Sequence, residues 1–123
     1  MSGATGCNET LARLYDDPDE RAVALRRLRP DDATIERRRT VFAALANEDR
    51  LRLVSALRDG EKCVCELQVV LDAPQSTVAT HLRKLKDAGV IRRRRKGKWS
   101  YYRLADGAVL DLLDLAAELE VTG

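Results

Sequence analysis

The sequence has no long apolar run, few aromatic residues and a single histidine. None of its 123 residues belongs to a stretch approaching the roughly 18 apolar residues needed to span a membrane. The N-terminal segment MSGATGCNET lacks a basic start followed by an apolar run, so we expect no signal peptide, no membrane partner and a cytoplasmic protein. In that compartment, the three cysteines, Cys7, Cys63 and Cys65, are expected to be reduced and available as ligands or redox groups.

Patterns typical of thiol enzymes are also missing. The sequence has no Cys-x-x-Cys motif and no βαβ pattern, and His81 has no second histidine to share general acid or base chemistry. We therefore expect a protein that is not an enzyme.

The net charge is only +2, but the basic residues are concentrated in one segment. Residues 83–103 contain ten Lys and Arg residues and one acid, a net charge of +9 that leaves −7 for the rest of the chain. A solvated charged face is the ordinary explanation for a charge run. A basic block of this length on an acidic body is more typical of a protein that binds nucleic acid.

Residues 73–91 predict a helix that suits DNA recognition. Val78, Leu82 and Leu85 form one apolar stripe, Pro74 can open the helix, and Gly89 ends it. The opposite face carries short hydrogen-bonding side chains followed by cations, which suits base edges in the major groove and then phosphates. The DNA-binding candidates on this helix are Gln75, Ser76, Thr77, Thr80, His81, Arg83 and Lys84.

The flanking segments complete a winged helix-turn-helix pattern. A short helix with Val64, Leu67 and Leu71, followed by a tight turn, precedes the polar-faced helix. After Gly89 the apolar period changes to two, which predicts strands over Val90–Arg95 and Trp99–Leu104. The basic tip of this hairpin would lie along the DNA backbone or in the minor groove. Its DNA-binding candidates are Arg93, Arg95, Lys96 and Lys98.

The two ends of the chain predict an arm and a dimer. Residues 1–30 show no apolar core of their own and read as an N-terminal extension of a DNA-binding domain at residues 31–123. A helix over residues 106–121 is apolar on more than one face, which indicates packing against a second copy. The expected fold is therefore mainly α with a small β-hairpin (α+β), a homodimeric winged helix-turn-helix.

Three segments together resemble the arsenic-repressor (ArsR/SmtB) family of winged-helix dimers. They are LANEDRLRLVSALRDGEKCVCEL, STVATHLRKLKDAGVI and RKGKWSYYRL, in one consistent order, and the resemblance covers about residues 41–104. Pro74 departs mildly from the pattern, since the family often has a capping serine there. The resemblance implies a repressor that dimerises through its first and last helices. It also implies binding to double-stranded operator DNA and release by a ligand, often a thiophilic metal or metalloid.

The segment KCVCEL resembles the thiol site of the family's arsenic, antimony, cadmium and lead sensors. Arsenic sensors have a third cysteine where this chain has Gln68, whereas cadmium and lead sensors take ligands from an N-terminal arm such as the one that carries Cys7. Those sensors often have a second arm cysteine, which Leu11 replaces here. The set that the resemblance implies is therefore Cys7, Cys63 and Cys65. Three thiolates suit As(III), Sb(III), Bi(III) or Pb(II), and Cd(II) would need a further oxygen ligand.

The spacing of Cys63 and Cys65 sets a structural condition on this site. Residues i and i+2 of a regular helix point about 200° apart. Both thiolates reach one ion only if Cys63 lies off the helix or the first helical turn opens. Binding would then strain the segment that positions the recognition helix.

Other interpretations of the same residues stay open. Cys7 could be incidental while Cys63 and Cys65 pack as small apolar residues, two cysteines could form a redox-sensing disulfide, or the protein could bind DNA without a ligand. The family's zinc site on the last helix is absent, because only Asp106 matches it and the other positions hold Ala108, Leu119 and Thr122. His81 is expected to fix the recognition helix or contact DNA rather than bind metal.

Overall fold

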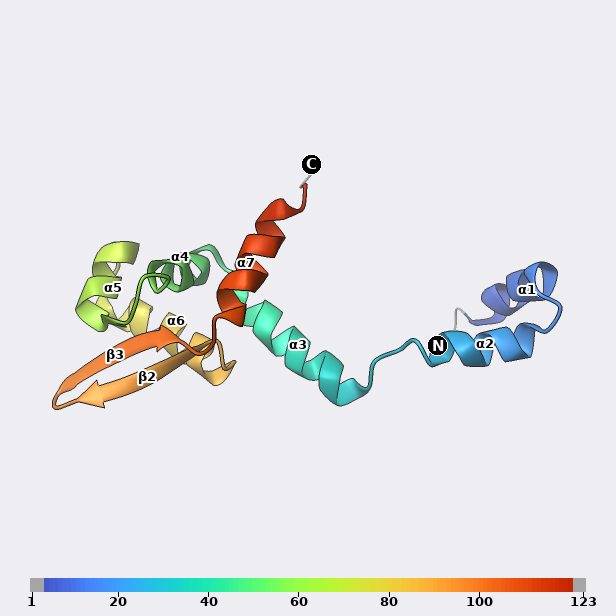
Figure 1. The fold of residues 1–123 in the computed structure, drawn as a ribbon, viewed down its shortest axis with the longest axis horizontal. Coiled ribbons are helices and arrows are strands. Elements are labelled where there is room, and N and C mark those ends of the chain that lie inside the picture. Colours follow the sequence, from blue (N-terminus) through green and yellow to red (C-terminus); the bar gives the residue numbers. More distant parts are fainter. Residues whose placement is uncertain (1–3, 121–123) are drawn as a thin grey trace. The chain divides into compact units, whose positions relative to one another are not determined.

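The computed structural model describes residues 4–120, and the side chains of residues 9–120. The chain divides into two units, residues 1–36 and residues 37–123. The elements in chain order are α1 (Ala4–Leu14), α2 (Pro18–Arg26), α3 (Asp32–Leu45), α4 (Glu48–Ala56), β1 (Lys62–Cys63), α5 (Val64–Leu71), α6 (Gln75–Asp87), β2 (Ile91–Lys96), β3 (Trp99–Leu104) and α7 (Ala108–Glu118). Figure 1 labels all of them except the two-residue strand β1.

The first unit is a pair of short helices held by local interactions. Asp17 caps α2 by accepting a 3.0 Å hydrogen bond from the Glu20 N–H, and Pro18 occupies the first helical turn, where it needs no amide hydrogen bond. The Arg21 guanidinium lies 5.3 Å from the centre of the Tyr15 ring. No residue of α2 is buried, so this helix contributes no core of its own.

The core of the second unit lies among α4, α5, α6 and the start of β2. In the helices, the most deeply buried side chains follow the period of 3.6 residues that the sequence shows. In β2 only the first residue, Ile91, is buried. Leu53 and Val54 come from α4, Leu67 from α5, and the recognition-helix stripe from α6. Full burial is seen for Leu53, Val54, Leu67, Val78, Leu82, Leu85, Val90 and Ile91.

Caps and turns set the helix boundaries in this core. The Asn47 side chain accepts a 3.0 Å hydrogen bond from the Arg50 N–H and begins α4, as the sequence predicts. Pro74 stands one position earlier than expected, as the N-cap of α6. Asp72 ends α5 in the left-handed conformation, and Gly89 follows α6 with φ of +79°.

The sheet has three antiparallel strands in the order β1-β3-β2. The hairpin of β2 and β3 turns through Gly97, which has φ of +62°. The two-residue strand β1 was not predicted from the sequence, and it pairs Cys63 with Tyr101 of β3. The prediction of a mainly helical fold with a small antiparallel wing is confirmed, with β1 as an addition. Within residues 4–120, no helix is long and apolar enough to cross a membrane.

Candidate nucleic-acid interface and cysteine site

The recognition helix α6 presents the expected two faces. Val78, Leu82 and Leu85 are fully buried, which fixes the rotation of the helix on the core. The opposite face is exposed at Gln75, Ser76, Thr77, Thr80, Arg83 and Lys84. The Thr80 hydroxyl donates a 3.0 Å hydrogen bond to the Ser76 carbonyl oxygen one turn earlier. The remaining polar tips face solvent, where they are available to base edges and phosphates.

His81 differs from the other candidates on α6, because it faces α4 and not solvent. Its side chain is only 15% exposed. Its Nδ1 lies 3.3 Å from Arg50 Nη1, and its Nε2 lies 3.8 Å from a carboxylate oxygen of Asp49. This geometry supports the role of fixing the recognition helix over that of contacting DNA.

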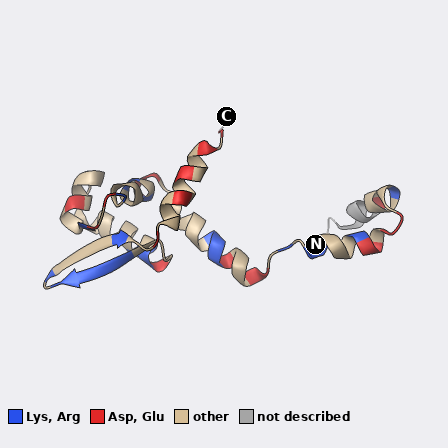
Figure 2. Cartoon of the chain, in the orientation of Figure 1, with Lys and Arg blue, Asp and Glu red and all other residues tan. Residues whose placement is uncertain are grey.

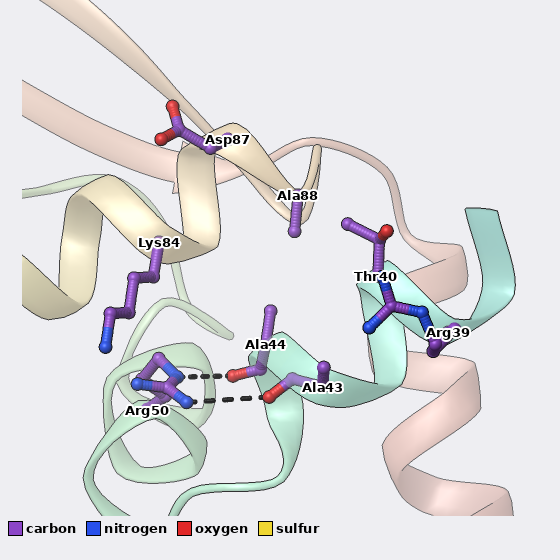
Figure 3. Close-up of a pocket in the computed structure, with 8 residues that line it drawn as sticks. All are labelled: Arg39, Thr40, Ala43, Ala44, Arg50, Lys84, Asp87 and Ala88. Atoms are coloured by element: carbon purple, nitrogen blue, oxygen red, sulfur yellow. Dashed lines mark hydrogen bonds between the residues drawn. The ribbon is translucent and has the colours of Figure 1, made fainter. Parts of the chain in front are cut away.

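Arg50, which the sequence pattern did not single out, contacts both α3 and α6. Its Nε donates a 2.5 Å hydrogen bond to the Ala44 carbonyl oxygen, and Nη2 lies 3.5 Å from the Ala43 carbonyl oxygen (Figure 3). These carbonyl groups belong to the last turn of α3, where carbonyl oxygens have no hydrogen-bond partner within the helix. A sequence signal existed, since Arg50 is a cation in the first turn of a helix, where the dipole disfavours it unless it has a specific partner.

Arg50 also lines a cavity of about 330 Å³ bounded by α3, α4 and α6. Figure 3 shows that its side chains come from all three helices. The lining residues are Arg39, Thr40, Ala43, Ala44, Arg50, Lys84, Asp87 and Ala88.

The wing carries a continuous run of cations on β2, coloured blue in Figure 2. Arg93 and Arg95 pair with Tyr102 and Ser100, while Arg94 points to the other side of the sheet. All of the predicted wing contacts, Arg93, Arg95, Lys96 and Lys98, are exposed.

Arg94 is held by the body of the protein instead of being free for DNA. Its Nε donates a 3.2 Å hydrogen bond to Glu61, its Nη2 makes a second bond to the same carboxylate, and its guanidinium lies 5.2 Å from the centre of the Tyr101 ring. The bond to Arg94 lowers the pKa of Glu61, and the charges of Arg94, Arg103 and Lys96 act in the same direction. Glu61 immediately precedes β1, so this ion pair joins the wing to the segment that carries Cys63.

Cys63 lies off the helix that carries Cys65. Cys63 is the N-cap of α5 with extended backbone (φ −82°, ψ 167°), and its N–H donates a 3.0 Å hydrogen bond to the Glu66 carboxylate. This bond lowers the pKa of Glu66, as does the nearby Cys63 thiol. Cys65 is exposed in the first turn of α5, and both thiols are free. Both thiolates were expected to reach one ion only if Cys63 lay off the helix or the first helical turn opened. The structure meets the first of these conditions.

The third predicted ligand cannot be placed with these two. Cys7 lies in α1, but its side chain is outside the described residues. Among the described side chains, no group of three or more His, Cys, Asp or Glu residues could hold a metal ion.

Cys65 also lines a second cavity, of about 270 Å³, between α5, the start of α6 and the tip of the wing. The helices contribute Val64, Cys65, Gln68 and Gln75, and the wing contributes Lys98, Trp99 and Ser100.

Comparison with known proteins identifies the family. The family "Bacterial regulatory protein, arsR family" matches residues 47–93, from the cap of α4 into β2. A transcriptional repressor SmtB homolog from Synechocystis is 33% identical over 115 residues, which cover 91% of this chain and 87% of that protein. The chain belongs to the ArsR family. It is a transcriptional repressor that binds DNA, and it is not an enzyme.

Two further comparisons agree with this ArsR-family assignment. The arsenic resistance transcriptional regulator ArsR1 of Pseudomonas putida is 46% identical over 65 residues, which cover 52% of this chain and only 51% of that relative. The solution structure of a homodimeric winged helix-turn-helix domain from Mycobacterium bovis, a possible ArsR-family regulator, matches with a TM-score of 0.66. It is 31% identical, and the match covers 72% of this chain and 84% of that one.

Helices α3 and α7 of this ArsR-family chain leave large apolar side chains uncovered. Phe42 of α3 is 55% exposed, Leu115 of α7 is 60% exposed, and Leu119 just beyond it is 73% exposed. Leu112 and Leu113 are half-buried and pack against the core of their own chain. An exposed ion pair with a 2.7 Å distance joins Asp114 of α7 to Arg58, in the turn after α4.

Proposed function

We propose that this ArsR-family chain is a homodimeric repressor that a thiophilic metal or metalloid releases from its operator. The ion would bind the thiolates of Cys63 and Cys65, with Cys7 as the third ligand. The observation that carries the proposal is the position of Cys63, off α5 and directly before the helix-turn-helix. The protein would act in the cytoplasm, where bacterial operators lie.

Binding to double-stranded DNA would divide between two elements. The exposed start of α6, with Gln75 and Thr77, would read base edges in the major groove, and Arg83 and Lys84 would contact phosphates. The wing would follow the backbone with Arg93, Arg95, Lys96 and Lys98. These wing contacts are charge-charge contacts that carry affinity more than sequence preference.

The homodimer would form through α3 and α7. A single chain leaves Phe42, Leu115 and Leu119 in water, and covering such side chains with the same surface of a second copy would remove this apolar area from solvent. Two copies of α6 related by a two-fold axis would then read two half-sites of an operator.

Ion binding would act on the junction between β1 and α5. Drawing the Cys63 and Cys65 sulfurs to one ion would constrain the N-cap that Glu66 now closes with its 3.0 Å hydrogen bond. Because α5 packs on α6 and β1 pairs with β3, the change would reach both DNA-binding elements. Release requires only that the ion bind the free protein more tightly than the DNA-bound protein.

The ligand set favours ions that take three sulfur ligands. As(III), Sb(III), Bi(III) and Pb(II) fit three thiolates, while Cd(II) needs an additional oxygen from water or protein. The name of one relative agrees with this set, because the Pseudomonas putida protein is an arsenic resistance regulator.

The test is release of an operator fragment selected from random-sequence DNA, followed by fluorescence anisotropy. As(III) and Pb(II) should release the wild-type protein but not Cys63→Ser or Cys65→Ser, and all three proteins should bind DNA without the ion. An unchanged metal response when both of these cysteines are replaced would reject the site. Release of wild type by peroxide alone, with no response to the ions, would instead support a redox-sensing disulfide.

A further inference from the structure

The cavity between α5, α6 and the wing brings together groups assigned to different tasks. Cys65 of α5 is a proposed inducer ligand, whereas Gln75 of α6 and Lys98 of the wing are proposed DNA contacts. All three line the same cavity of about 270 Å³. The inducer site and part of the DNA site therefore share one space in the folded protein.

We propose that the inducer and the operator compete directly for this cavity. A group attached to the Cys65 sulfur would displace the DNA backbone from Lys98 and a base edge from Gln75, in addition to any reshaping of α6. The inference deepens the proposed function and rests on its assignment of operator binding. On this proposal the inducer releases the operator partly by occupying the cavity, and not only by changing the conformation of the protein.

The side chains around the cavity suit the binding of a DNA phosphate. The Lys98 ammonium lies 5.6 Å from the centre of the Trp99 ring, so the aromatic face holds the cation beside the opening. The Ser100 hydroxyl and the Gln75 amide add hydrogen-bonding groups to the same lining. An ammonium with neutral donors is the usual protein environment of a DNA phosphate.

The same cavity is open to the Cys65 thiol, which is exposed. A substituent on this sulfur therefore has access to the space that the phosphate would use. A substituent with negative charge would also pair with Lys98 and repel the phosphate, so the charge of the substituent should matter as well as its size. A purely conformational mechanism has no such dependence on charge.

Cys63 provides the matched control. It lies two residues away and is half-buried in β1, and it is not among the residues that line this cavity. Modification of Cys63 perturbs the N-cap of α5 without filling the space beside Lys98. Competition therefore predicts different behaviour for two neighbouring thiols.

The experiment uses two full-length variants with a single thiol each. One retains Cys65 (Cys7→Ser, Cys63→Ser) and the other retains Cys63 (Cys7→Ser, Cys65→Ser). Methanethiosulfonate reagents convert the thiolate to a mixed disulfide and release methanesulfinate. The groups transferred are methylthio, the anionic sulfonatoethylthio and the cationic trimethylammonioethylthio, and each modified protein is compared with its own unmodified form.

The anionic group on Cys65 should weaken operator binding by about tenfold more than the cationic group of similar length. The methylthio group should have the smallest effect, and reduction of the disulfide should restore binding. On Cys63, the anionic and cationic groups should have equal effects. Equal effects of the two charges on Cys65 would overturn the inference.

A second measurement uses only those variants whose binding to operator shows that they are folded. Saturating operator should slow the reaction of Cys65 with the methylthio reagent by at least about tenfold. If bound operator blocks the thiol, this ratio of rates corresponds to a free-energy difference of ~1.4 kcal/mol. The reaction of Cys63 should change little. An unchanged Cys65 rate would overturn competition, whereas failure of the unmodified variants to bind any selected operator would reject the proposed function itself.

Discussion

Arg50 Nη1 lies 3.3 Å from His81 Nδ1, while the Nε of the same guanidinium donates to the Ala44 carbonyl oxygen. One side chain of α4 therefore joins the end of α3 to the middle of the recognition helix. If α3 belongs to the dimer interface, Arg50 links the spacing of the two protomers to the orientation of α6. His81 then serves DNA binding without touching DNA.

Arg50→Lys should weaken operator binding more than its conservative charge suggests. A lysine cannot reproduce the guanidinium geometry that reaches α3 carbonyls and His81 together. Leaving a partly buried carbonyl without its partner costs about 1–3 kcal/mol, measurable as a lower urea midpoint. Operator affinity, measured well below that midpoint, should fall as well.

Arg52→Lys is the control for this change. Among the described side chains, Arg52 makes exposed ion pairs with Glu48 and Asp49 on its own helix, so its replacement should change the free energy of unfolding by less than ~0.5 kcal/mol. Equal losses of operator affinity in the two variants would contradict a linking role for Arg50.

Two neighbouring arginines of β2 should differ in their contribution to DNA binding. Arg95 has an exposed side chain on the face of the proposed contacts, and Arg95→Gln should reduce the slope of log K against log salt by about 0.9. Arg94 is already bound to Glu61, so Arg94→Gln should change the slope less. Titrations at several salt concentrations decide this, and equal slopes for the two variants would show that DNA competes Arg94 away from Glu61.

Leu115→Arg should produce monomers that bind operator weakly. Leu115 is largely exposed in the single chain, so the substitution disrupts a dimer interface without disturbing the protomer core. Leu112 and Leu113 are poorer positions, because they also pack inside their own chain. Sedimentation gives the mass, and Val69→Arg is the control, since Val69 is 80% exposed on α5. A stable wild-type monomer would refute the proposed interface.

Acid should destabilise wild type more than Glu66→Gln. The Cys63 N–H favours the carboxylate, so the pKa of Glu66 is lower in the folded protein than in the unfolded chain. The stabilisation by this bond is therefore complete above the unfolded-state pKa and is lost as pH falls below about 4. Thermal unfolding from pH 6 to pH 3 measures it, and parallel curves for wild type and Glu66→Gln would exclude the effect.

The sequence was sufficient for the helix-turn-helix because its signals are local. The stripe of Val78, Leu82 and Leu85, the Asn47 cap and the change to a period of two at the wing all act within a few residues. Each appears where it was predicted. The strand β1 was missed because two residues carry no periodicity, and only pairing with β3 makes them a strand.

The side-chain contacts across the site could not be predicted from the sequence, for a different reason. Arg50 and His81 are 31 positions apart, as Glu61 and Arg94 are 33 apart, and nothing local indicates that either pair meets. The sequence showed Cys63 and Cys65 as a pair, but it left open whether Cys63 lay on the helix. The N-cap geometry answers this, because a capping residue has non-helical backbone.

Mixed dimers test whether Cys7 reaches the thiol site of the other protomer. The N-terminal arm could span to a partner at modest cost, because the entropy of loop closure grows only slowly with loop length. Consider Cys7→Ser paired with Cys63→Ser. If the arm crosses, one site has all three thiols and the other lacks two. If the arm stays within its own chain, each site lacks one thiol.

The crossing arrangement therefore predicts one tight Pb(II) site per mixed dimer, and the other arrangement predicts none. Titration of the thiolate-to-lead absorbance counts the tight sites, and differently tagged subunits allow the mixed dimer to be purified. Cys7→Ser alone should still bind the ion through Cys63 and Cys65, but more weakly, and should release operator only at higher Pb(II). Full wild-type affinity in Cys7→Ser would remove Cys7 from the site, because a third thiolate cannot be lost from a three-sulfur ion without weakening its binding.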